Sequence, residues 1–139
     1  MARQLRASLR AIALSVSTLS AAEWTGWRGP NGDARVTSGS LPTAWATGKN
    51  VAWKTPTPGP GTSCPLVVGE RVYVTCYTGY GLEPGQGDPK QLNRHLLCLD
   101  RKTGEELWTK RFEPKLPEHR YSGEGSYHGY AASTPSGSA

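Results

Sequence analysis

Long hydrophobic runs and helical patterns are what this sequence most clearly lacks. After the first 22 residues, no apolar pattern recurs every three or four positions over the length of a helix, which excludes a helical bundle. Glycine and proline are abundant instead, with 17 and 11 of the 139 residues, about a fifth of the chain. Frequent turns between short segments favour an all-β fold, and a chain of this length normally makes one domain.

The sequence also lacks a block of charge of one sign. Its formal net charge is +5, but Arg3, Arg6 and Arg10 all lie in the N-terminal segment. From Glu23 onward, 13 lysines and arginines are interspersed with 11 aspartates and glutamates. A surface that follows nucleic-acid phosphates needs clustered basic side chains, so we expect no nucleic-acid partner.

Cysteine is scarce, and its spacing excludes the common metal-binding patterns. Cys64, Cys76 and Cys98 include no CxxC pair. They are interpreted either as small buried residues on strands or, for Cys76 and Cys98, as a cross-strand disulfide. Catalytic and phosphate-binding motifs such as GxSxG and GxGxxG are absent as well. We therefore assign no catalytic residue and no metal ligand.

Residues 1–22 have the order of a secretory signal peptide. A basic segment is followed by a short apolar stretch and then by small residues that end at Ala22. We expect cleavage after Ala22 and export to the periplasm or the cell exterior; the alternative is an amphipathic N-terminal helix. The apolar stretch is too short to cross a bilayer, so no membrane span is expected.

Residues 23–50 are irregular and rich in tryptophan, whereas the rest of the chain has strand patterns. Trp24, Trp27 and Trp45 are too many large apolar groups to leave in water, so we expect them to pin this segment onto a β core or a neighbouring element. Gly69 and Glu70 predict a hairpin turn between two β-branched runs. The expected strands are 50–56, 64–68, 71–77, 95–100 and 105–111.

The most informative run is HLLCLDRKTGEELWTK, residues 95–110. Asp100 begins a tight turn in which its carboxylate can accept backbone N–H groups, and Gly104 ends the turn with a positive φ angle. The last four expected strands make one antiparallel meander, which is the form of a β-propeller blade.

These residues carry a resemblance to the repeat of pyrroloquinoline-quinone (PQQ)-like β-propellers, in which an aliphatic strand end is followed by Asp-x-x-Thr-Gly-x-x-x-Trp. The matching positions are Leu99, Asp100, Thr103, Gly104 and Trp108. The runs WTGWRGPNGDARV and YSGEGSYHGYAASTP further resemble exported propeller proteins of planctomycete-type bacteria. In such propellers the tryptophan of each outer strand docks between adjacent blades. The resemblance gives Trp108 and Trp53 this structural role; stacking of Trp108 on a quinone is the alternative.

The resemblance implies an all-β, incomplete propeller with flanking irregular segments. Residues 51–135 would hold one four-stranded antiparallel blade, a preceding strand and the start of the next blade. Residues 136–139 would be a truncated tail. The chain is thus expected to be an N-terminal fragment with about one blade.

The loop at residues 117–130 concentrates the remaining chemistry-bearing side chains. Its histidines and glutamates could bind a metal or transfer protons near neutral pH, and the candidate site residues are His119, Arg120, Glu124 and His128. They follow no ordered ligand motif such as HExxH. The alternative is an ordered loop whose tyrosines pack on the blade and whose histidines lie at the rim.

Three functions are consistent with the sequence. The first is an exported binding or assembly scaffold without a cofactor, whose partner is a protein or the missing blades of its own propeller. The second, implied by the resemblance, is the N-terminal part of a quinoprotein oxidoreductase, in which PQQ and calcium would require the complete propeller. The third is a truncated gene product without a function of its own.

Overall fold

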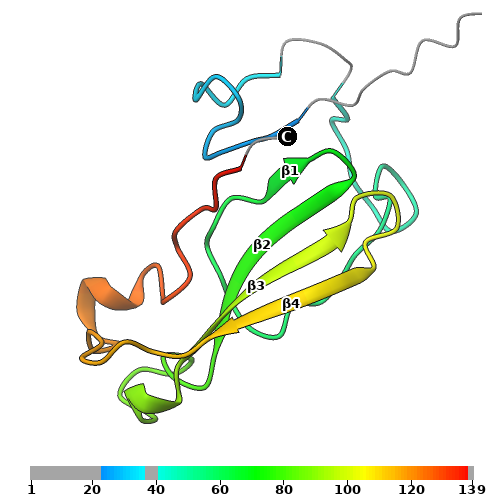
Figure 1. Ribbon diagram of the computed structural model, residues 1–139. Helices are drawn as coiled ribbons and strands as arrows, with labels where there is room; N and C mark the ends of the chain where they lie inside the picture. The colour runs from blue at the N-terminus through cyan, green and yellow to red at the C-terminus, as the bar shows by residue number, and fades with distance from the viewer. Residues whose placement is uncertain (1–22, 37–40, 138–139) are drawn as a thin grey trace, which may run out of the picture.

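The computed structural model describes residues 23–36 and 41–137 (Figure 1). The expected signal peptide lies outside the described residues, as do residues 37–40 and 138–139. The core of the fold is one antiparallel sheet whose strands are neighbours in chain order. The strands are β1 (Leu66–Val68), β2 (Arg71–Thr78), β3 (Asn93–Asp100) and β4 (Glu106–Phe112). The predicted all-β class and the four-stranded meander are confirmed.

Helical structure is confined to two short 3-10 turns. These are η1 (Pro89–Gln91) and η2 (Gly123–Ser126), and no α-helix occurs in residues 23–36 and 41–137. Over the same residues, none of the helices has the length and apolar character needed to cross a bilayer.

The two predicted turns organise the sheet. Gly69 has a φ angle of 52° at the first position of the two-residue β1–β2 turn, where type II′ hairpins require a positive value. Gly104 has a φ angle of 75° at the end of the β3–β4 turn. A side chain at Gly104 would also overlap the indole of Trp53, which lies directly on this glycine. Both turn predictions are confirmed.

The sheet has one face that the chain itself covers, here called the covered face. Because side chains alternate along a strand, the register places Val72, Val74 and Cys76 on the same side as Leu97 and Leu99. These side chains form a core cluster against which Trp53 packs. The segment that carries Trp53 passes behind the sheet in Figure 1.

The predicted strand at residues 50–56 is wrong. No strand is present there, because side chains rather than a backbone ladder attach this segment to the sheet. The indole Nε1 of Trp53 donates to the carbonyl oxygen of Arg101 at 2.9 Å. The Thr55 hydroxyl donates to the carbonyl oxygen of Gly104 at 2.6 Å. The segment therefore adds no strand to the sheet.

The cysteines are free, and the sheet register explains why. Cys76 lies opposite His95 on the covered face, whereas Cys98 lies between Tyr73 and Trp108 on the other face. A disulfide between Cys76 and Cys98 would have to cross the sheet. The interpretation as small buried residues is confirmed for these two cysteines, while Cys64 is half-buried.

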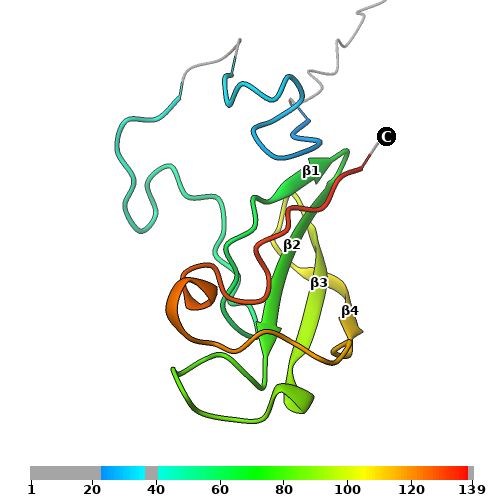
Figure 2. The same ribbon diagram turned by 90° about the vertical axis from the view of Figure 1, so that its left-hand side faces the viewer.

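The three N-terminal tryptophans do not behave alike. Trp24 forms an isolated bridge with Val67 of β1, with both backbone hydrogen bonds at 2.8 Å. Trp27 and Trp45 are 68% and 64% exposed. The expectation that all three pin the segment to the β core or a neighbouring element holds only for Trp24. The segment touches the sheet at its β1 edge, where Figure 2 shows it next to the C-terminal residues.

Candidate binding surface

The predicted repeat residues around Asp100 build the β3–β4 turn. The Asp100 carboxylate accepts the backbone N–H groups of Lys102 at 2.8 Å and of Thr103 at 2.9 Å, together with the Thr103 hydroxyl at 3.2 Å. These hydrogen bonds favour the charged carboxylate and lower the pKa of Asp100. Leu99 is buried in the covered-face core next to this turn. The four residues Leu99, Asp100, Thr103 and Gly104 therefore have a structural role.

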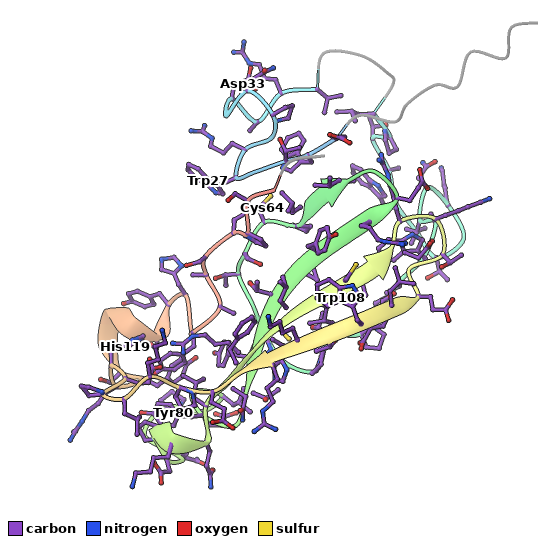
Figure 3. All side chains as sticks on the ribbon, viewed as in Figure 1. Trp27, Asp33, Cys64, Tyr80, Trp108 and His119 are labelled. Carbon is purple, nitrogen blue, oxygen red and sulfur yellow. The ribbon has the colours of Figure 1, made fainter. Side chains whose placement is uncertain are left out.

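The two tryptophans of the predicted repeat lie on opposite faces of the sheet. Trp53 is half-buried on the covered face, over Gly104. Trp108 lies opposite Cys98 in β3, with its ring centroid 5.9 Å from that of Tyr73. It remains 43% exposed. Figure 3 shows Trp108 on the side of the sheet that faces the viewer.

We call this second side, which presents Tyr73, Leu96, Cys98, Trp108 and Phe112, the open face. In Figure 1 the C-terminal segment lies beside β1 and β2, and no described segment crosses in front of β3 and β4. Phe112 is 44% exposed. Cys98, at the centre of the face, is fully buried by its neighbours.

Two shallow hollows adjoin the open face and share the side chains of Leu96 and Pro135. The first, of about 300 Å³, extends to Phe112 and Tyr130. The second, of about 200 Å³, extends to Tyr73 and is closed on its other side by Leu66 and residues 135–137. The two hollows lie along the C-terminal segment, and apolar side chains provide much of their lining.

The loop at residues 117–130 is attached to the end of the open face by its tyrosines. Tyr130 is buried with Tyr77 and Tyr80, and Tyr121 packs against this cluster. Burial raises the pKa of both Tyr77 and Tyr130 to about 12. The loop is ordered by aromatic packing, as one of the two interpretations of the sequence predicts.

The four candidate residues of this loop have different surroundings. The His119 ring stacks on Tyr130 with centroids 4.4 Å apart. Arg120 borders a separate hollow beside Tyr80. His128 is exposed, and its carbonyl oxygen accepts the Thr62 hydroxyl at 3.0 Å. Glu124 lies in η2, and its side chain is outside the described part of the structure.

No metal-binding arrangement is found in the part of the chain that the structure describes. Over residues 23–36 and 41–137, no three His, Cys, Asp or Glu side chains gather in a way that could hold an ion. Asp88 caps η1 by accepting the backbone N–H of Lys90 at 2.9 Å.

An ion pair that the sequence does not reveal fixes the loop to the sheet. Arg94 of β3 donates two hydrogen bonds to the Glu118 carboxylate, at 2.8 and 2.9 Å. Its Nε donates to the carbonyl oxygen of Tyr130 at 3.0 Å. The ion pair lowers the pKa of Glu118 and raises that of Arg94. The partners lie 24 residues apart, and no spacing rule links them.

The open face and its surroundings form the candidate binding surface. Its features are exposed aromatic rings, two apolar hollows, Lys110 between Trp108 and Phe112, and the paired Arg94. A scan against protein-family models, a search of curated proteins and a search of solved structures found no match to this chain.

Proposed function

We propose that this chain forms a PQQ-like propeller blade that acts as a binding or assembly scaffold. The observation that carries the proposal is the asymmetry of the sheet. The chain's own segments cover one face across β2 and β3, while on the other face the C-terminal segment covers only β1 and β2, and Trp108 and Phe112 of β4 remain exposed beside two apolar hollows. Aromatic side chains in the centre of a patch are typical of surfaces that bind proteins.

The shape of the open face favours another β-sheet as its partner. Sheets pack face to face about 10 Å apart, with side chains that interdigitate. The two hollows flanking Leu96 would receive such side chains. In this proposal the partner sheet belongs to a further blade or to another protein, because repeat folds bury their sheet faces against neighbouring units.

The proposal also includes export, with residues 1–22 as the leader. It includes no cofactor and no catalytic step. The loop at residues 117–130 serves the scaffold by holding the end of the open face in place, through Arg94, Glu118 and the buried Tyr130.

Site-specific photo-crosslinking in the native cells tests the proposal. A photoreactive phenylalanine analogue replaces Leu96 on the open face; the matched control carries the same group at Lys54, an exposed residue beside Trp53. We expect crosslinks from position 96 to a peptide with alternating β-strand pattern and an Asp-x-x-Thr-Gly-x-x-x-Trp repeat. Equal crosslinking from both positions, or a lipid or nucleic acid as the crosslinked molecule, would overturn the proposal.

A further inference from the structure

β4 is an edge strand whose outer side is unpaired in the described structure. The sheet order places β4 last, and all seven of its residues are exposed. Across residues 23–36 and 41–137, none of the backbone hydrogen bonds outside the sheet involves β4. The opposite edge differs, because β1 has three residues and is bridged by Trp24. An exposed edge of this length is a template for another strand.

The register identifies the β4 residues whose backbone groups point away from β3. The Asp100 N–H donates to the carbonyl oxygen of Glu105 at 2.8 Å. Hydrogen-bonded and non-hydrogen-bonded pairs alternate in an antiparallel ladder. The next pair, Leu99 with Glu106, is therefore of the non-hydrogen-bonded kind, and the backbone N–H and C=O of Glu106 point outward.

The bulge in β4 continues this pattern at Thr109. The pairing shifts between Cys98 and Leu99, so that β4 has one additional residue. After the bulge, Thr109 and Arg111 lie opposite Leu97 and His95 and occupy the next two outward positions. The Thr109 hydroxyl donates to Glu106 Oε1 at 2.8 Å, which places these two side chains on one face. Glu106, Thr109 and Arg111 are consecutive outward positions.

We propose that β4 pairs antiparallel with β4 of a second copy of this chain, about a two-fold axis at Thr109. In this register Glu106 lies opposite the partner's Arg111, and Trp108 lies opposite the partner's Lys110. The symmetry forms each pair twice. Opposite charges across strands and a cation over an indole both stabilise such a pairing. The two sheets become one sheet of eight strands.

The charge sequence of β4 disfavours an axis at any of its charged residues. A two-fold axis at Glu106, Lys110 or Arg111 would place like charges directly opposite each other, which destabilises strand pairing. An axis at Thr109 instead brings the acidic end of each strand to the basic end of the other. The pairing uses the backbone edge of β4 and leaves Leu96 and the two hollows free, so it can fail without affecting the scaffold proposal.

Sedimentation equilibrium of the full chain with charge-swap variants tests the pairing. We expect a reversible dimer, weakened about tenfold in Arg111→Glu and in Glu106→Arg, because each change places two like-charge pairs at the interface. The double variant Glu106→Arg/Arg111→Glu re-forms both ion pairs and should dimerise nearly as well as the unchanged chain. Lys90→Glu, the same charge reversal in η1, should have no effect.

Two results would overturn the proposal. One is a chain that remains monomeric over the concentration range of the experiment. The other is a dimer that the single charge reversals do not weaken, or that the double variant does not restore. Circular dichroism of each variant separates loss of pairing from loss of fold.

Discussion

The two faces of the sheet are built from the same strands but have different surroundings. In β3, Leu97 and Leu99 lie under the segment that carries Trp53, whereas Leu96 points to the open face between two hollows. A strand that is apolar on both faces is typical of a sheet buried on both sides. This chain covers the first side with the segment that carries Trp53, but it covers the open face only along β1 and β2, where Tyr77 is buried against Tyr130. In the scaffold proposal, a partner supplies the cover that β3 and β4 lack on this face.

Truncating one leucine on each face should give the largest difference in unfolding free energy between the two faces. Leu97→Ala is expected to cost about 3 kcal/mol of unfolding free energy, because Leu97 is fully buried in the covered-face core. Leu96→Ala, one residue earlier, should cost less than about 1 kcal/mol, because its side chain borders open hollows. Urea unfolding of the full chain measures both; equal losses would contradict the assignment of the faces.

Substituting two glycines with positive φ angles tests the packing of Trp53 on the covered face. Gly104→Ala should cost about 2–3 kcal/mol, because the new side chain is strained and also displaces the Trp53 indole. Gly69→Ala is the matched control, since nothing lies within 4 Å of the added atom. It should cost only the conformational strain, about 1 kcal/mol. Urea unfolding measures both changes. A larger loss of unfolding free energy in Gly69→Ala than in Gly104→Ala would contradict the packing of Trp53 on Gly104.

Stability should fall on acidification because Arg94 holds the Glu118 carboxylate in its charged form. The pKa of Glu118 is lower in the folded chain than its ordinary value of 4.5. The stabilisation by the charged Glu118 carboxylate is therefore complete above pH 4.5 and is lost as the pH falls through the folded-state pKa of Glu118. Glu118→Gln should destabilise the chain by about 1–2 kcal/mol at neutral pH.

Urea midpoints measured between neutral and acidic pH test this linkage. Glu118→Gln should have a shallower acid limb than the unchanged chain. Part of the slope should remain, because the pKa of Asp100 is also lowered. An unchanged slope in Glu118→Gln would contradict the role given to the Arg94–Glu118 pair.

The smallest expected change in stability is at Trp108. Trp108→Ser should alter the unfolding free energy by less than about 1 kcal/mol, because the indole is exposed in the free chain. It should nevertheless abolish the crosslink from position 96, since it removes the aromatic anchor of the open face. A Trp108→Ser chain that crosslinks normally would show that the partner does not use this face.

The strands and turns could be predicted from the sequence because their signals are local. Alternating β-branched residues and the Asp100–Gly104 turn each determine structure within a few residues. Residues 50–56 carry the same local pattern, yet they form no strand. Trp53 and Thr55 bond to the β3–β4 turn instead, and this is a tertiary interaction that periodicity does not encode.

The loop at residues 117–130 shows how little of the candidate site could be predicted from the sequence. Its composition drew attention to His119, Arg120, Glu124 and His128, but the contacts that order the loop come from Glu118, Tyr121 and Tyr130. Their partners are on β2 and β3, far away in the sequence. The opposite placement of Trp53 and Trp108 likewise depends on which face the chain covers, and only the fold reveals it.

Hydroxyl-radical footprinting of Trp53 and Trp108 tests the central claim most directly. The labelling of both residues would be measured in the isolated chain and in the assembly purified from its native cells. The account predicts strong labelling of Trp108 in the isolated chain and protection in the assembly, with weaker and unchanged labelling of Trp53. Equal labelling of Trp108 in the two samples would contradict the claim that a partner covers the open face.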